Sequence, residues 1–241
     1  MSTAPSVVFD LDDTLIHTSA TFDAARDTFA ALMRREGFDS AAAVTLLQDI
    51  DLRRVEREGF GRTRFPVSMV EAYTTLCAQN GLVARTDVSA AVRAVGDHVY
   101  DTPPEPFAHT HDTLRALKGE GCAMYLLTKG DPDVQHFRIE SNSLRAYFDE
   151  VYIVPRKGIT ELRHVVATHS LDRVTTWVVG DGIRSDINPA IEDGMLPILV
   201  GEKRWQYEDV APVSSRFYRV MHVGHVPEYV LANGNRPPLP A

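Results

Sequence analysis

Near its N-terminus the chain reads Val7-Val8-Phe9-Asp10-Leu11-Asp12-Asp13-Thr14-Leu15. Two β-branched residues followed by an aromatic residue, Val7-Val8-Phe9, predict a short buried strand. The strand leads directly into three carboxylates, those of Asp10, Asp12 and Asp13. Buried charge is costly unless it is paired or bound to a cation, so this cluster favours a hard metal ion such as Mg²⁺, which takes oxygen ligands. Taken alone, the stretch is about equally consistent with an acidic turn that ends a strand.

The composition is typical of a globular protein. The 241 residues, 44% of them hydrophobic, allow one large domain or a core domain that carries a smaller insert. A net charge of −8 argues against nucleic acid or an anionic membrane as a partner. Cys77 and Cys122 show no zinc or disulfide spacing and are expected to be buried free thiols. With no signal peptide and no membrane-spanning run in the sequence, we expect a cytoplasmic protein.

A helical pattern follows the first motif for about ninety residues. Four amphipathic faces can be traced, without strand-like alternation between them. They are marked by Phe22, Phe29, Leu32 and Met33; by Leu46, Leu47 and Ile50; by Val70, Tyr73 and Cys77; and by Val88, Val92, Val95 and Val99. The proline-rich segment Pro103-Pro104-Glu105-Pro106 ends the stretch. We therefore predict a helical domain over residues 17–106, inserted into a core domain made of residues 1–16 and 107–241.

From residue 107 onwards, apolar strands alternate with helical segments. The expected strands are 123–127, 151–154, 176–179, 196–200 and, less regular in pattern, 217–220. Alternation of this kind predicts an α/β fold, a Rossmann-like doubly wound parallel sheet with helices on both faces. Asp10, Thr128 and Asp181 each follow an apolar strand immediately. Since ligands of such sheets bind outside the carboxyl ends of the strands, we expect these three side chains to face one crevice.

Four motifs in order carry a resemblance to a known family. They are Asp10-Leu11-Asp12-Asp13-Thr14, Leu127-Thr128-Lys129, Arg156-Lys157-Gly158 and Gly180-Asp181-Gly182-Ile183-Arg184-Ser185-Asp186. Together they resemble the haloacid-dehalogenase (HAD) superfamily of phosphatases and phosphotransferases. The resemblance covers the whole core, and the helical insert falls where many members carry a cap. It implies a Mg²⁺-dependent phosphohydrolase of a small, soluble phosphorylated metabolite, with an aspartyl-phosphate intermediate.

The resemblance also implies a role for each residue. Asp10 would be the nucleophile, and Asp12 would protonate the leaving group and later activate water. Mg²⁺ would be held by Asp10, the backbone carbonyl of Asp12 and Asp181, with Asp186 as an outer ligand or a brace for Lys157. Thr128, Lys129 and Lys157 would bind the phosphate. Lys157 also has a physical argument, because a cation just before a helix opposes the helix dipole and an anionic partner would explain it.

Two features of the sequence need separate comment. Gly182 stands where the family often has Ser or Asn, which leaves the metal ligands intact but predicts a different loop geometry. The insert carries five arginines within twelve residues: Arg53, Arg54, Arg57, Arg62 and Arg64. Interleaved Glu56 and Glu58 predict a solvated helix face for the first three. Arg62 and Arg64 lie in a glycine-containing segment, and for them substrate binding is nearly as good an explanation.

Three alternatives to a phosphatase remain at this point. A phosphotransferase or phosphomutase would use the same aspartates and a different phosphoryl acceptor. A 2-haloacid dehalogenase would need the nucleophile but not the second acid. A non-enzymatic binding or regulatory member would be expected to have lost one of the four motifs, and none is lost here. The sequence makes no prediction of the individual substrate or of the oligomeric state.

Overall fold

The computed structural model describes residues 4–202 and 205–232. The chain divides into two compact units, one made of residues 1–18 and 105–241 and the other of residues 19–104. These divisions lie two residues from the predicted ones at 16/17 and 106/107. The ends of the predicted core domain, residues 1–3 and 233–241, lie outside the described residues.

The first unit is built on a parallel six-stranded sheet with strand order β3-β2-β1-β4-β5-β6. Its strands are β1 (Ser6–Phe9), β2 (Ala123–Lys129), β3 (Glu150–Val154), β4 (Thr176–Gly180), β5 (Leu196–Val200) and β6 (Tyr218–Val220). β1 is central, and Val8 pairs with Tyr125 on one side and Val178 on the other. Every neighbouring pair of strands runs parallel, which requires a crossover connection from each strand to the next. The predicted α/β fold is confirmed.

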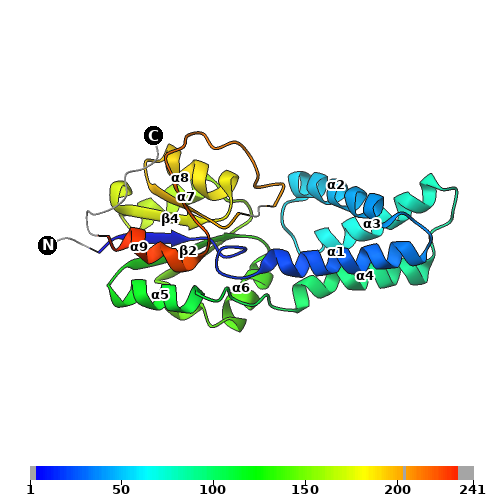
Figure 1. Ribbon diagram of the computed structural model, residues 1–241, viewed down its shortest axis with the longest axis horizontal. Coiled ribbons are helices and arrows are strands. Elements are labelled where there is room, and N and C mark those ends of the chain that lie inside the picture. The colour runs from blue at the N-terminus through cyan, green and yellow to red at the C-terminus, as the bar shows by residue number, and fades with distance from the viewer. Residues whose placement is uncertain (1–3, 203–204, 233–241) are drawn as a thin grey trace. The chain divides into compact units, whose positions relative to one another are not determined.

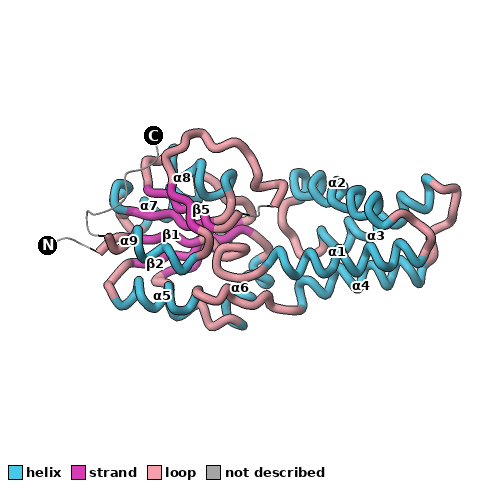
Figure 2. The backbone as a smooth tube through the Cα atoms, in the orientation of Figure 1, coloured by secondary structure: helices cyan, strands magenta, loops and turns pink. Residues whose placement is uncertain are grey.

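Helices cover both faces of this sheet (Figures 1 and 2). Because side chains alternate along a strand, Val7 and Phe9 point to one face and Val8 to the other. The first face packs on residues of α5 (Thr110–Gly119), α6 (Pro132–Ser141) and α9 (Val226–Val230). The second packs on α7 (Ile159–Thr168) and α8 (Asn188–Glu192). Short 3-10 turns lie at Arg145–Tyr147, Arg173–Thr175 and Val223–His225.

The two segments that connect the first unit to the insert are joined by backbone hydrogen bonds. The His17 amide donates to the Glu105 carbonyl at 2.8 Å, and the Phe107 amide donates to the Leu15 carbonyl at 3.0 Å. The buried Thr110 hydroxyl donates to that same Leu15 carbonyl at 2.7 Å. These bonds anchor the chain where it leaves the sheet and where it returns.

The second unit contains four helices, as the four amphipathic faces predict. Its helices are α1 (Thr18–Arg35), α2 (Ser40–Glu58), α3 (Arg64–Gln79) and α4 (Thr86–Asp101). Asp39 caps α2 by accepting a hydrogen bond from the Ala42 amide at 2.7 Å. The interior is apolar and contains Phe29, Met33, Leu47, Met69 and Val92.

Cys77 in the second unit and Cys122 in the first are buried free thiols, as expected. None of the described helices combines the length and the apolarity that crossing a membrane requires.

Candidate active site

The loop after β1 turns sharply and presents its carboxylates at the carboxyl end of the sheet. The Asp10 amide still donates to the Val179 carbonyl of β4 at 2.8 Å, so Asp10 is fixed by the central strand pair. Asp13 then adopts a left-handed backbone with φ +58°, which aspartate tolerates better than most residues. Its amide donates to the Ile16 carbonyl at 2.9 Å, which closes the loop. The loop holds Thr14 with its hydroxyl 3.4 Å from Asp10 Oδ2.

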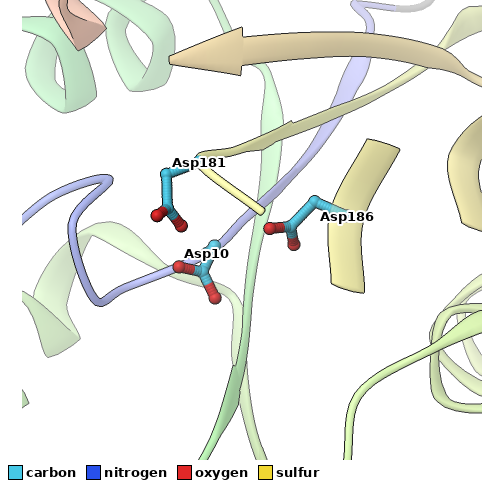
Figure 3. A group of neighbouring side chains, drawn as sticks. All are labelled: Asp10, Asp181 and Asp186. Atoms are coloured by element: carbon cyan, nitrogen blue, oxygen red, sulfur yellow. The ribbon is translucent and has the colours of Figure 1, made fainter. Parts of the chain in front are cut away.

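Three buried carboxylates meet at this end of the sheet. Asp10, Asp181 and Asp186 each offer an oxygen within 4.8 Å of the others, and their side chains point toward one another (Figure 3). Asp10 follows β1 and Asp181 follows β4, as predicted from the strand ends. Lys157 Nζ lies 2.6 Å from Asp10 Oδ1 and 2.5 Å from Asp186 Oδ1. The structure therefore brings Asp10, Asp181, Asp186 and Lys157 together.

Asp186 reaches the cluster through an unusual turn. Residues Ile183–Ile187 form a single π-helical turn that leads into α8, a type of irregularity often found at functional sites. Asp186 Oδ2 accepts a hydrogen bond from the Gly182 amide at 3.1 Å. A Cβ atom added at Gly180 would overlap the Asp186 carboxylate, so the close packing of this carboxylate against β4 requires glycine there.

Burial perturbs the ionisation of the cluster. Desolvation, aided by neighbouring Asp186 and only partly offset by Lys157, raises the pKa of Asp10 to about 7. Desolvation and the negative charges of Asp10 and Asp186 raise the pKa of Asp181 well above its usual range. For Lys157, burial opposes the charged form, but Asp10 and Asp186 outweigh it and raise its pKa. Nearby positive charge thus only partly offsets the cost of burying the carboxylates, while the lysine stays protonated.

The charge balance of this cluster fits a divalent cation. The ammonium group of Lys157 contacts two of the three carboxylates, those of Asp10 and Asp186, and Asp181 has an oxygen within 4.8 Å of both. With all three aspartates ionised, their negative charge exceeds the positive charge of Lys157 by two, in a place where burial makes uncompensated charge costly. Carboxylate oxygens are the ligands that Mg²⁺ prefers. Within residues 4–202 and 205–232, no other group of three potential ligands converges in this way.

Thr128 and Lys129 lie at the end of β2, beside β1, but Lys129 is already paired. Its Nζ lies 2.8 Å from Oε1 of Glu208, a buried residue that the sequence analysis did not single out. Glu208 also accepts from the Ser185 hydroxyl at 2.7 Å and from the Ser185 amide at 3.1 Å. Burial would raise the pKa of Glu208, but Lys129 and Ser185 lower it below its usual value. Burial likewise opposes the charge on Lys129, and Glu208 and Asp10 raise its pKa.

The position of the Glu208 side chain explains why residue 182 is a glycine. A Cβ atom at Gly182 would overlap Glu208 Oε2 and lie 3.0 Å from Asp186 Oδ2. The space that a Ser or Asn side chain would need is therefore taken by Glu208. Glu208 thus gives a physical reason for glycine at this position, and the difference in loop geometry stays a prediction.

Asp12 is held by three donors, none of which the sequence analysis singled out. Its Oδ1 accepts from Thr18 Oγ1 at 2.5 Å and from an Arg138 guanidinium nitrogen at 2.9 Å. Its Oδ2 accepts from Gln135 Nε2 at 2.7 Å. A signal was available, because Val134, Gln135, Arg138 and Ile139 share one helix face by spacing. Two polar residues on an otherwise buried face indicate a buried partner.

Arg62 and Arg64, predicted to bind substrate, have partners inside the helical unit. Arg62 forms an ion pair with Asp101 at the end of α4. Arg64 is only 6% exposed and forms an ion pair with Asp51 of α2, which also accepts from the Ser68 hydroxyl at 2.9 Å. The Asp51 pair accounts for Arg64 as part of the interior of this unit. For Arg62, substrate binding stays a prediction.

Comparison with known proteins identifies relatives over most of the chain. A family model described as a haloacid dehalogenase-like hydrolase matches residues 5–192. The glyceraldehyde 3-phosphate phosphatase of Methanocaldococcus jannaschii is 24% identical over 211 residues, which cover 85% of this chain and 87% of that protein.

Solved structures share the fold. A haloacid dehalogenase-like family hydrolase from Xanthomonas campestris superimposes with a TM-score of 0.78 at 23% identity, covering 95% of this chain and 91% of that one. The L-2-haloacid dehalogenase of Xanthobacter autotrophicus superimposes with a TM-score of 0.61 at 16% identity, covering 96% of this chain and 99% of that one. At these identities the structural likeness speaks for the fold alone.

Proposed function

The chain belongs to the haloacid dehalogenase-like hydrolase family, and we propose that it is a Mg²⁺-dependent phosphatase of a small phosphomonoester. One observation carries the proposal: Asp10 and Asp12 follow the central strand on one loop, and Asp10 lies in a buried cluster with Lys157, Asp181 and Asp186. A phosphate ester is an anion, so its attacker works only where nearby charge is neutralised. The similarity to a glyceraldehyde 3-phosphate phosphatase supports the same class of substrate.

In the first step, an oxygen of Asp10 attacks phosphorus while the bond from phosphorus to the ester oxygen breaks. This forms an aspartyl-phosphate, and Asp12 gives its proton to the departing oxygen. In the second step, water attacks the phosphorus of this intermediate and Asp12 takes the proton. The bond to Asp10 breaks, which releases inorganic phosphate and restores both carboxyl groups.

Mg²⁺ would be held by side-chain oxygens of Asp10 and Asp181 and by the backbone carbonyl of Asp12, with Asp186 as an outer ligand. The excess of two negative charges that the three aspartates have over Lys157 when they are ionised supports this proposal. When bound, the ion would neutralise phosphate charge and orient the ester for in-line attack. The proposal assigns Asp186 a second task, since its ion pair with Lys157 would hold that lysine at the cluster.

The phosphate oxygens would be bound by Thr128 and Lys157. Thr128 is fully buried at the end of β2, where its hydroxyl accepts from Gln135 and keeps its own proton available to donate. Lys129 is paired with Glu208, so in this proposal its charge contributes to the field at Asp10. A small phosphorylated metabolite in the cytoplasm, and neither nucleic acid nor membrane, remains the proposed partner.

The proposal is tested by measuring phosphate release from a panel of phosphomonoesters, glyceraldehyde 3-phosphate among them, with Mg²⁺ or with EDTA. Asp10→Asn keeps the shape of the side chain but removes the nucleophile, so it should abolish turnover while leaving the unfolding midpoint near that of the wild type. Phosphate release by Asp10→Asn near the wild-type rate, or full activity in excess EDTA, would contradict the proposal.

Asp12 separates the phosphatase from the dehalogenase, whose structures share this fold. A halide leaves without a proton, whereas an alkoxide needs one. We expect Asp12→Ala to lower turnover of an alkyl phosphate by about 10²–10⁴-fold, and turnover of p-nitrophenyl phosphate by less, because nitrophenolate is a weak base. Faster halide release from 2-haloacids than phosphate release from any ester would favour the dehalogenase instead. Transfer of the phosphoryl group to an added alcohol or sugar would favour a phosphotransferase.

A further inference from the structure

Asp12 accepts hydrogen bonds from two side chains of α6, a helix to which the sequence motifs assign no role. Gln135 Nε2 donates to Asp12 Oδ2 at 2.7 Å, and Arg138 donates to Asp12 Oδ1 at 2.9 Å. The two bonds reach opposite oxygens of one carboxylate. Together they fix both the rotamer of Asp12 and the plane of its carboxylate, which a single contact would leave free to rotate.

Gln135 and Arg138 are themselves buried and held by further hydrogen bonds. Gln135 is 1% exposed and Arg138 is 5% exposed. The Gln135 amide nitrogen also reaches Thr128 Oγ1 at 2.7 Å and the Lys129 carbonyl at 3.2 Å, while its Oε1 accepts from Arg138 at 3.2 Å. The network therefore sets the orientation of the amide group and links Asp12 to the end of β2.

Stability alone does not account for this arrangement. A buried arginine is costly, and a well-packed apolar residue of similar size is often neutral or stabilising in its place. Arg138 also has a buried guanidinium nitrogen, Nη2, without a hydrogen-bond partner among the described residues. The neighbouring positions on the same face, Val134 and Ile139, are apolar and buried in the ordinary way. On this face, the two polar residues thus lie where the helix meets Asp12, and the positions beside them are apolar.

From these contacts we infer that Gln135 and Arg138 are positioning residues, which hold the Asp12 carboxylate where it exchanges protons with the leaving group and with water. The inference rests on the proposed phosphatase function. Both steps of that reaction need the Asp12 oxygens in one place, since the same group must serve the ester oxygen and then the attacking water. Small displacements of a proton-transfer group cost much of its contribution to rate.

The test compares kcat/KM for the alkyl phosphate that the panel finds to be hydrolysed fastest with kcat/KM for p-nitrophenyl phosphate. Arg138→Met removes the guanidinium and keeps the length of the stem. We expect it to lower the alkyl value at least about 10-fold more than the nitrophenyl value, within the range that a general acid contributes. Arg138→Lys should recover part of the loss, and Gln135→Leu should act in the same direction. Arg145→Met, the same change at an exposed arginine that donates to the Phe148 carbonyl, is the matched control and should leave both values unchanged.

A cycle with Asp12→Ala decides between positioning and a general effect on the fold. If Arg138 acts through Asp12, adding Arg138→Met to Asp12→Ala should not change the ratio of the two substrates further. In urea unfolding, which needs no substrate, the two substitutions should together cost less than the sum of their separate effects. Equal losses for both substrates, or additive effects in both measurements, would overturn the inference. A wild type that hydrolyses no phosphomonoester would instead overturn the proposed function, and unfolding would still decide whether Arg138 and Asp12 are coupled.

Discussion

Gly182 and Glu208 occupy one space beside the carboxylate cluster, and this makes a direct prediction. A Ser side chain at position 182 would overlap Glu208 Oε2, so Gly182→Ser should destabilise the protein by about 1–3 kcal/mol, as overpacking of a tight interior does. Urea unfolding measures the effect. Gly61→Ser is the matched control, because a Cβ atom there meets nothing within 4 Å.

A shorter side chain at position 208 should reduce the destabilisation caused by Gly182→Ser. Glu208→Asp shortens the side chain by one methylene and keeps the charge that Lys129 needs. In that background, Gly182→Ser should cost measurably less than in the wild type. An equal cost in both backgrounds would show that the overlap is not with Glu208.

At the residue scale, sequence reasoning found the side chains that follow strands and missed those that arrive from elsewhere. Asp10, Thr128 and Asp181 could be expected at one edge because parallel strands end together. Glu208 could not, because it lies in an irregular segment after β5 whose path depends on long-range packing. Gln135 and Arg138 stood on a recognisable helix face, but their partner Asp12 is more than 120 positions away in sequence.

At the scale of elements, α2 and α3 are joined by a buried ion pair between Asp51 and Arg64. The Ser68 hydroxyl donates to Asp51 as well, at 2.9 Å. Asp51→Ala would leave a buried guanidinium without its carboxylate, and such a loss costs about 3–5 kcal/mol. We expect urea unfolding of Asp51→Ala to show a loss of this size.

Replacing both members of the pair distinguishes a buried charge effect from simple loss of packing. Asp51→Leu combined with Arg64→Met should cost less than Asp51→Ala alone, since no charge is then left unpaired. Breaking the exposed pair of Arg115 and Asp112 with Arg115→Ala should have little measurable effect. A double variant less stable than Asp51→Ala would contradict this account of the pair.

Element boundaries were predictable where local chemistry sets them. The sequence Asp131-Pro132 is a local signal for a helix start, with aspartate as the cap and proline in the first turn, and Asp131 does cap α6 by accepting from the Asp133 amide at 3.1 Å. The π-helical turn at Ile183–Ile187 was not predicted, because only the helix after it carries a local signal. That turn follows from tertiary contacts, in which Asp186 reaches both the Gly182 amide and Lys157.

At the scale of the whole molecule, stability without metal depends on protons held in the aspartate cluster. Asp10 has a pKa of about 7 in the folded protein against an ordinary value of 3.8, and the pKa of Asp181 is also raised. Between pH 3.8 and about pH 7, Asp10 therefore binds more protons in the folded state than in the unfolded chain. The stability contributed by these groups is therefore present at low pH and is lost as the pH rises toward 7. Carboxylates such as Glu208, whose pKa is lowered, contribute in the opposite direction and lose stability as the pH falls.

The pH-dependent contributions of other groups, such as Glu208, cancel when the stability of the protein is compared with and without Mg²⁺ at the same pH. A cation at Asp10 and Asp181 requires their ionised forms, so binding competes with protons at low pH and relieves repulsion at high pH. We therefore expect Mg²⁺ to raise the Tm of the wild type more at pH 8 than at pH 5, with EDTA-treated protein as the reference. Asp181→Asn should reduce this difference between the two pH values, because it removes one of the charges that the ion balances. A Mg²⁺-induced shift that is equal at both pH values, or unchanged in Asp181→Asn, would mean that the ion binds elsewhere and that the excess charge of the cluster has another counterion.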